Sequence, residues 1–336
     1  MKKDFLEGKT ILITGGTGSF GKKFTEMVLK KFKPKKLIIY SRDEMKQWQM
    51  HQDFEKLDKN KVLRYFVGDV RDIPRLQLAL SGVDYVVHAA ALKIITTAEY
   101  NPFECIKTNV LGAMNLIQCS LEAKVKKVVA LSTDKASNPV NLYGATKLCS
   151  DKLFVAGNAY SGANGTCFSV VRYGNVMGSR GSIIPLFLSL KKEKSIPVTD
   201  IRMTRFMITL EAGVELVWRA LQEAIGGEIF VPKIPSMKIT DVAKAIAPKA
   251  KLKIIGIRPG EKIHESMISE EDARTTYEYS DCYKILPAIY DWHHCAQRIG
   301  EGKKCTEGFT YSSGDNHQWM SASALQSWIK KEYKND

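Results

Sequence analysis

Apolar and polar positions alternate in blocks over the first half of the chain. Five short runs are rich in β-branched and aliphatic residues, and each has the length of a buried strand. These runs are residues 10–14, 36–40, 62–67, 84–88 and 127–131. Residues 103–123, between the last two runs, repeat apolar positions at helical spacing. Strands alternating with helices predict an α/β fold, with a parallel sheet covered on both faces and ligands bound beyond the strand carboxyl ends.

The first apolar run leads directly into a glycine-rich turn. Its glycines are spaced G-x-x-G-x-x-G, which allows a tight turn and close approach of the backbone to a diphosphate at a helix N-terminus. A turn that only connects two elements is the alternative. Its position between a buried strand and a helix favours a Rossmann-like, doubly wound fold that binds a dinucleotide. The expected contacts are Gly15, Thr17, Gly18, Ser19, Phe20 and Gly21.

Residues after the next three strands indicate which dinucleotide binds. Arg42 offers a planar cation suited to a ribose 2′-phosphate, which favours NADP over NAD; a surface arginine beside Asp43 is the alternative. Asp69 can accept from an adenine amino group, with Val70 against the ring, or it can cap a helix. Small residues after the fourth strand let a flat ring lie close. The expected contacts are Ser41, Arg42, Asp43, Lys46, Asp69, Val70, Ala89, Ala90 and Ala91.

Two stretches after the fifth strand gather proton-transfer groups. They are Ser132-Thr133-Asp134-Lys135 and Tyr143-Gly144-Ala145-Thr146-Lys147. Tyr143 and Lys147 share a face if this stretch is helical, so the ammonium can lower the pKa of the phenol toward neutrality. A solvated surface pair is the alternative for Tyr-x-x-x-Lys alone. Because these stretches and the glycine turn all follow strand ends, we expect one cleft in which Tyr143 acts as a base.

Size and composition are those expected of a cytoplasmic enzyme. With 336 residues, 44% of them hydrophobic, the chain can form a nucleotide-binding domain and a smaller C-terminal substrate-binding lobe. The expected division is 1–182 and 183–336, with a strand near 229–231 returning to the sheet. No apolar run is long enough to span a bilayer, so no membrane partner is expected. The odd count of seven cysteines indicates reduced thiols, and His293-His294-Cys295 lacks the partners a metal site needs.

Several longer motifs are spread along the chain: GGTGSFG, IIYSRDE, GDVRD, HAAALK, LSTDKA, NPVNLYGATKL, TDIRMTRF and GIRPGEK. With the Tyr-x-x-x-Lys pair, they resemble the extended short-chain dehydrogenase/reductases. Within that family they resemble the inverting UDP-N-acetylglucosamine 4,6-dehydratases of the pseudaminic acid pathway. The resemblance extends from about Lys9 to Trp319. It implies NADP as cofactor, UDP-N-acetylglucosamine as substrate and a homo-oligomer.

The resemblance also implies residue roles. Tyr143 takes the proton of the sugar 4-hydroxyl as hydride passes to NADP⁺, while Lys147 holds Tyr143 ionised and Thr133 hydrogen-bonds nearby. The resulting ketone acidifies the C5 proton. Lys135, which must be neutral to act, then removes that proton, and Asp134 assists departure of the C6 hydroxyl. Hydride returns to C6, and the product is UDP-2-acetamido-2,6-dideoxy-β-L-arabino-hex-4-ulose.

Lys135 is the informative position, because retaining relatives have Thr-Asp-Glu in this motif. A surface ion pair of Asp134 and Lys135 is the alternative. Among enzymes, the other candidate is a UDP-N-acetylhexosamine 4-epimerase, which would use Tyr143 and Lys147 but needs no base for C5.

Further contacts are implied by the resemblance. Those to the cofactor are Lys93, Val176 and Arg180, and those to the substrate are Lys93, Asn175, Ile183, Thr199, Arg258, Glu261 and Gln318. The Arg258 guanidinium suits a diphosphate. One departure affects this site: the chain has Lys93-Ile94-Ile95-Thr96 where relatives have Lys-His-Val-Pro, which leaves sugar specificity or loop geometry open.

The net charge of +14 supports a different class, a nucleic-acid-binding protein on a reductase-like scaffold. The lysines, however, are spread in short groups among acidic residues, and no aromatic residues interleave with them as base-stacking surfaces require. We therefore expect a solvated surface, an anionic nucleotide-sugar site and no nucleic acid partner.

Overall fold

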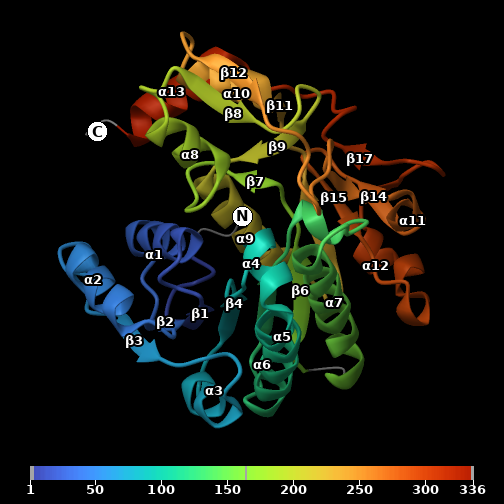
Figure 1. The fold of residues 1–336 in the computed structure, drawn as a ribbon. Helices are drawn as coiled ribbons and strands as arrows, with labels where there is room; N and C mark the ends of the chain where they lie inside the picture. The colour runs from blue at the N-terminus through green and yellow to red at the C-terminus, as the bar shows by residue number, and fades with distance from the viewer. Residues whose placement is uncertain (1–3, 163–164, 334–336) are drawn as a thin grey trace.

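The computed structural model describes residues 4–162 and 165–333, and a ten-stranded sheet runs through this part of the chain (Figure 1). Its strand order is β16-β14-β15-β10-β6-β5-β4-β1-β2-β3, and the strands from β10 to β3 are parallel. The five apolar runs form strands within two residues of the predicted bounds. The parallel strands are β1 (Thr10–Thr14), β2 (Lys36–Ser41), β3 (Leu63–Val67), β4 (Tyr85–His88), β5 (Lys127–Leu131), β6 (Cys167–Val171) and β10 (Ile229–Pro232).

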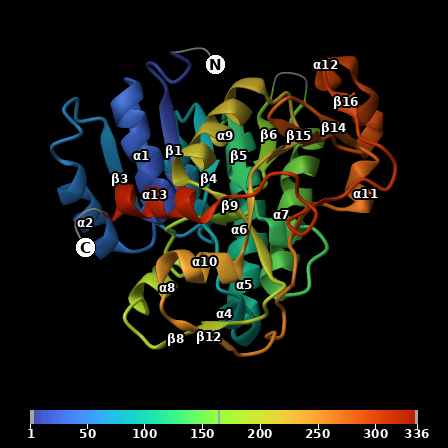
Figure 2. The same cartoon turned by 90° about the horizontal axis from the view of Figure 1, so that it is seen from above.

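Helices cover both faces of the sheet, as expected for a doubly wound fold. On one face α1 packs against α9 (Figure 2), and on the other α6 packs against α3 and α7 (Figure 1). The strands between them are almost entirely buried, as at Ile11 and Val128, because both sides of the sheet are covered. The helices of this layer are α1 (Ser19–Lys31), α2 (Glu44–Phe54), α3 (Ile73–Leu80), α4 (Ile95–Tyr100), α5 (Pro102–Ile106), α6 (Gly112–Glu122), α7 (Leu142–Gly157) and α9 (Leu210–Glu223).

The segment expected as one helix over 103–123 is divided into α5, a π-helical turn η1 (Lys107–Leu111) and α6. Asn109 within the turn is buried, and its amide bonds to both backbone groups of Leu92 at 2.9 Å and to Thr146 Oγ1 at 3.0 Å. These bonds tie the loop after β4 to α7. The turn thus braces two segments that carry site residues, which is a common use of π turns.

The edge of the sheet beyond β10 was not predicted. β15 (Cys282–Ile285) pairs antiparallel with β10, β14 (Thr276–Glu278) pairs with β15, and β16 (Lys303–Lys304) completes this margin. The sheet is therefore mostly, but not wholly, parallel. Short helical segments flank the margin: α11 (Glu270–Ala273), η4 (Ile289–His294) and α12 (Ala296–Ile299).

A second hydrophobic core lies above the carboxyl ends of the parallel strands (Figure 1). Its centre includes Phe187, Ile196 and Val242, all nearly inaccessible. It is built from β7 (Asn175–Val176), α8 (Ile183–Ser189), β8 (Ser195–Val198), β9 (Thr204–Ile208), β11 (Ser236–Lys238), α10 (Ile239–Ile246), β12 (Lys251–Ile254) and α13 (Ala322–Glu332). The division at residue 182 stays a prediction, because later strands rejoin the main sheet.

Three remaining elements connect these parts: η2 (Asp134–Ala136) follows β5, η3 (Asn158–Tyr160) follows α7, and β13 (Ser266–Ile268) pairs with β17 (Tyr311–Ser312). β13 also packs against η2, which brings the C-terminal part of the chain to the end of β5. Among the helices of the described residues, none has the length and apolar character needed to cross a bilayer.

Candidate active site

A cavity of about 790 Å³ separates the carboxyl edge of the sheet from the upper lobe. Its floor comes from the loops after β1, β2, β3, β4 and β5, and its roof from α8 and residues 258–261. The sequence placed the ligand site beyond the strand ends, and the cavity lies there. Most of the predicted contacts line it: Gly15, Thr17, Gly18, Ser19, Phe20, Gly21, Ser41, Arg42, Asp43, Lys46, Asp69, Val70, Ala89, Ala90, Ala91, Lys93, Thr133, Lys135, Tyr143, Lys147, Asn175, Val176, Arg180, Ile183, Thr199, Arg258 and Glu261.

The glycine turn fits a dinucleotide diphosphate. Gly15 has φ +65°, and a Cβ there would lie 2.8 Å from the backbone nitrogen of Ala90, so the turn has room only for glycine. No side chain caps the N-terminus of α1, and its N-cap residue is Gly18. Free N–H groups and the helix dipole therefore face the cavity, where an anionic group can lie against them.

Charged side chains mark the end of the cavity expected to hold the adenosine. Arg42 is half-exposed, with Nη1 3.5 Å from Asp69 Oδ2. Asp69 is also held by Arg71, whose Nε and Nη2 lie 3.0 and 2.8 Å from Oδ2. Burial alone would raise the pKa of Asp69, but the bonds from Arg71 outweigh it and the pKa is lowered. Asp69 is not the cap of α3, because Asp72 fills that role by accepting from Arg75 N at 3.0 Å.

Tyr143 and Lys147 lie on the first turns of α7 and both line the cavity, as predicted. Asn141 begins this helix by accepting from Gly144 N at 2.8 Å, and its amide donates to Gly260 O at 2.7 Å. That bond joins the helix to the roof. The expectation that Tyr143 has a pKa near neutrality is wrong for the ligand-free protein: burial raises its pKa to about 12, and the Lys135 charge and a bond with Thr133 offset this only partly. Burial also lowers the pKa of Lys147.

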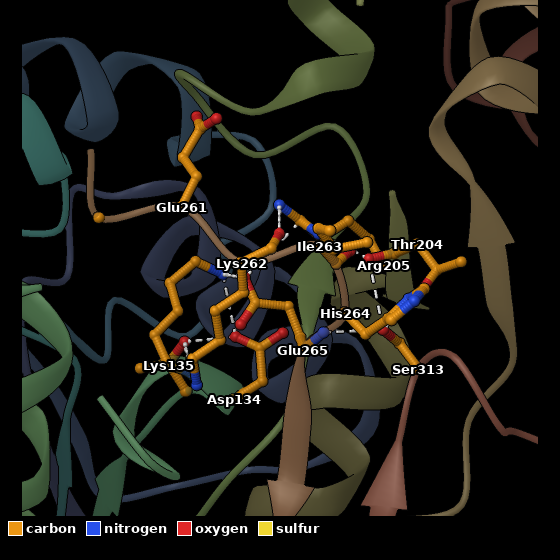
Figure 3. Close-up of polar contacts among 12 residues, drawn as sticks. Asp134, Lys135, Thr204, Arg205, Glu261, Lys262, Ile263, His264, Glu265 and Ser313 are labelled. Carbon is orange, nitrogen blue, oxygen red and sulfur yellow. Dashed lines mark hydrogen bonds and ion pairs between the residues drawn. The ribbon is translucent and has the colours of Figure 1, made fainter. Parts of the chain in front are cut away.

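Asp134 and Lys135 are brought together with a third residue, Glu265 (Figure 3). Lys135 Nζ lies 3.0 Å from Asp134 Oδ1 and 3.1 Å from Glu265 Oε1. The surface ion-pair alternative is wrong, since both carboxylates are buried. Burial would lower the pKa of Lys135, but the two carboxylates raise it above its ordinary value. The neutral lysine expected for a base is therefore not the resting form.

Burial also affects the other groups of this corner. It raises the pKa of Asp134, which lies behind Lys135 and does not itself line the cavity. Thr133 Oγ1 donates to Asp134 Oδ1 at 2.9 Å, so its hydroxyl proton is directed toward that carboxylate. Lys93, which also lines the cavity, has its pKa lowered by burial and by the Lys135 charge.

Of the predicted substrate contacts, Gln318 is not among the lining residues. Its backbone oxygen accepts from Ser236 N at 2.8 Å, which places its main chain beside β11. Ile94, at the departure from the related motif, lines the cavity and is half-exposed just before α4. Within residues 4–162 and 165–333, no three His, Cys, Asp or Glu side chains are grouped to hold a metal ion.

Several residues that line the cavity were not predicted from the sequence. Arg205 and Glu265 are the charged ones, and Met203, Phe187 and Pro197 are apolar. Arg205 lies within the TDIRMTRF motif, which could have drawn attention to it. Glu265 carries no such signal, because it reaches Lys135 only through the packing of β13 against η2.

A parallel sheet with a glycine turn, a Tyr-x-x-x-Lys helix and one shared cavity defines a short-chain dehydrogenase/reductase type of protein. A sequence profile of polysaccharide biosynthesis proteins matches residues 11–287. The chain belongs to this family of polysaccharide biosynthesis proteins.

Named relatives cover nearly the whole chain. A UDP-N-acetylglucosamine 4,6-dehydratase (inverting) of Campylobacter jejuni subsp. jejuni (serotype O:23/36, strain 81-176) is 56% identical over 95% of this chain and 96% of its own length. A UDP-glucose 4-epimerase of Rickettsia canadensis is 44% identical, with 88% of each chain covered. The solved structure of Pen from Bacillus thuringiensis aligns with a TM-score of 0.88 at 36% identity, over 98% of this chain and 99% of that one.

Proposed function

We propose that this chain is a UDP-N-acetylglucosamine 4,6-dehydratase that inverts C5 and uses NADP. The observation that carries the proposal is the Asp134–Lys135 pair: Lys135 lines the same cavity as Tyr143 and Lys147, and its Nζ lies 3.0 Å from Oδ1 of the buried Asp134 behind it. Two of these residues suit a redox step at C4, and the other two suit proton transfers at C5 and C6. The 56% identity to an enzyme of this name supports the same activity.

The redox step at C4 is assigned to Tyr143, with Thr133 and Lys147 beside it. When bound, an oxidised nicotinamide cofactor supplies a hydride acceptor for C4, a hydride donor for C6 and a positive charge. Tyr143 begins as a neutral phenol, because burial holds its pKa at about 12. Positive charge brought into the closed cavity lowers that pKa, so the phenol becomes a base only in the assembled complex. Lys147 holds the phenolate by charge from one helical turn away.

Elimination across C5 and C6 is assigned to Lys135 and Asp134. A 4-keto group acidifies the C5 proton, which the Lys135 amine removes. Asp134 is assigned the protonation of the departing C6 hydroxyl: it lies directly behind Lys135, whose Nζ is 3.0 Å from Oδ1, and burial raises its pKa, which favours uptake of a proton from Lys135. An enzyme that only oxidises and reduces C4, such as a 4-epimerase, needs neither Asp134 nor Lys135. Their presence therefore favours dehydration over epimerisation.

The choice of NADP rests on Arg42. Its guanidinium lines the cavity and is half-exposed, whereas the Asp43 carboxylate accepts from Lys46 N at 2.9 Å as the N-cap of α2. The Arg42 fork, with Nη1 3.5 Å from Asp69 Oδ2, presents its cation to the cavity, where it can meet a 2′-phosphate, while the neighbouring acid is engaged. The pseudaminic acid pathway, a homo-oligomer and a two-domain division at residue 182 belong to the proposal by family resemblance.

The experiment is incubation of the purified protein with UDP-N-acetylglucosamine, followed by mass spectrometry of the product. Loss of one water supports the dehydratase. A product of unchanged mass with an inverted C4 supports a 4-epimerase, the alternative favoured by the 44% identity to a protein of that name. Failure to convert the substrate contradicts both.

A further inference from the structure

Glu265 contacts Lys135 directly, yet the proposed dehydration chemistry assigns it no role. Its side chain is 2% exposed, lines the cavity and places Oε1 3.1 Å from Lys135 Nζ. Asp134 Oδ1 lies 3.0 Å from the same nitrogen, so one ammonium bridges two carboxylates (Figure 3). A lysine held from two sides has little freedom to turn away from the cavity.

The position of Glu265 is fixed from outside η2. Its backbone nitrogen donates to Ser313 Oγ at 2.9 Å, and its carbonyl oxygen accepts from Ser313 N at 2.8 Å. Arg205 donates to the carbonyl oxygens of Lys262 and Ile263, the residues that lead into Glu265. Two other segments of the chain therefore hold this carboxylate against Lys135, independently of Asp134.

A purely structural ion pair is the competing explanation, because buried pairs often serve only the fold. Two observations favour a role in chemistry. Lys135 and Glu265 both face the cavity, and the second oxygens of both acids, Asp134 Oδ2 and Glu265 Oε2, are buried without a hydrogen-bond partner among the described residues. Buried acceptors are normally satisfied, so a corner with two free ones is suited to hold a mobile proton or a ligand group.

We propose that Glu265 is a positioning residue for the proton transfers at C5 and C6, holding the Lys135 amine against Asp134 so that this pair shares one proton. The inference rests on the proposed dehydration. Glu265 itself remains ionised and gives up no proton. Its negative charge favours the proton on Lys135 or Asp134 over its loss to solvent.

The proton balance closes within the pair. Transfer of one proton from Lys135 Nζ to Asp134 Oδ1 leaves an amine and a carboxylic acid. The amine takes the C5 proton, and the electron pair of the C5–H bond enters the 4-keto system as an enolate. The acid protonates the C6 hydroxyl, the C6–O bond breaks, water leaves, and the electron pair forms the C5–C6 double bond. Lys135 is then an ammonium again and Asp134 a carboxylate.

Other charged or titratable groups face Lys135 and set the sign of a pH test. They are Asp134 on η2, Tyr143 on α7, Arg205 on β9, Lys262 before β13 and Lys93 after β4. Only Asp134 and Glu265 are acids placed to retain the shared proton. Without the Glu265 charge, the proton is therefore lost at a lower pH.

The test compares Glu265→Gln and Glu265→Asp with Glu228→Gln. Glu228 is an equally buried glutamate, paired with Arg298 at 3.3 Å and remote from the cavity, so its loss reports stability alone. We expect Glu265→Gln to lower turnover about 10²-fold and to move the alkaline limb of the kcat profile down by about one pH unit or more. Glu265→Asp keeps the negative charge, so the alkaline limb of its kcat profile should lie near that of wild type, with turnover between those of wild type and Glu265→Gln. Glu228→Gln should leave the profile in place.

Glu265→Gln with wild-type turnover, or with reduced turnover and an unshifted limb, overturns the inference. Competitive acetylation, read by mass spectrometry at Lys135 in wild type and in Glu265→Gln, is a second test that needs no turnover. Lys135 should titrate at a higher pH in wild type than in Glu265→Gln, and equal titration in the two proteins overturns the inference. If wild type releases no water from UDP-N-acetylglucosamine, the proposed function fails, whereas acetylation still reports on the Glu265 contact.

Discussion

Lys135 Nζ lies 3.0 Å from Asp134 Oδ1, and this contact joins two consecutive residues at the carboxyl end of β5. Neighbours in a strand point to opposite faces, but the 3-10 turn η2 lets these two side chains meet. The cavity thus receives an amine with a carboxyl group directly behind it. The predictions below follow from this arrangement and from its surroundings.

Lys135→Met should reduce dehydration at least about 10²-fold, because the base for the C5 proton is lost while the volume is kept. Exchange of hydride at C4, followed with substrate deuterated at C4, should persist, since Tyr143 and Lys147 remain. Lys191→Met, an exposed lysine outside the cavity, is the control. Turnover of Lys135→Met close to that of the control would remove Lys135 from the mechanism.

Tyr143 should be a neutral phenol in the ligand-free protein, since burial places its pKa at about 12. The measurement is the tyrosinate absorbance of wild type minus that of Tyr143→Phe, which reports the ionised fraction of Tyr143. Because the ionised fraction of an acid rises with pH, this difference should stay near zero up to about pH 10, the ordinary pKa of tyrosine. Adding oxidised cofactor should bring the transition to lower pH. A transition near neutrality without ligand would contradict the burial effect.

Arg42→Gln should weaken NADP binding about tenfold or more and leave NAD binding nearly unchanged. The reason is the loss of a charge-assisted hydrogen bond, which contributes about 1.5–3 kcal/mol. Isothermal titration calorimetry with both cofactors measures the difference. Arg202→Gln, an exposed arginine paired with Asp200 outside the cavity, serves as control. Equal losses for the two cofactors would show that Arg42 does not read the 2′-phosphate.

Gly15→Ala should cost stability and cofactor affinity together. Gly8 and Gly15 have nearly the same positive φ, +64° and +65°, but a Cβ at Gly8 meets nothing within 4 Å while one at Gly15 lies 2.8 Å from Ala90 N. Gly8→Ala should therefore lower the free energy of unfolding only by the cost of a side chain at positive φ, about 1–2 kcal/mol. Thermal unfolding and NADP titration of both variants separate backbone strain, which both share, from the steric clash expected only at Gly15. Equal losses of stability and NADP affinity in the two variants would contradict a close-packed diphosphate turn.

The sequence was sufficient for the features that depend on local pattern. The inner strands β1, β4 and β5 are largely apolar runs because both sheet faces are covered there, and the glycine turn is marked by spacing. Contacts that depend on packing between distant segments could not be read in this way. Glu265 reaches Lys135 from beyond β12, and the π turn at Asn109 arises from bonds to Leu92 and Thr146.

The pKa expectations failed for the same physical reason. Spacing on a helix indicates that Lys147 is near Tyr143, but it does not indicate how deeply the phenol is buried. Burial proved to be the larger effect. Likewise, Lys135 was expected to be neutral when it acts as a base, whereas the negative charges of Asp134 and Glu265 raise its pKa.

The most direct test of the account is conversion of UDP-N-acetylglucosamine by wild-type protein in D₂O, with the product followed by NMR. We expect a 4-keto-6-deoxy sugar that carries deuterium at C5 in the inverted configuration, and no such product from Lys135→Met. A retained C5 configuration, or a C4 epimer without deuterium at C5, would contradict the assignment of Asp134 and Lys135 to an inverting elimination.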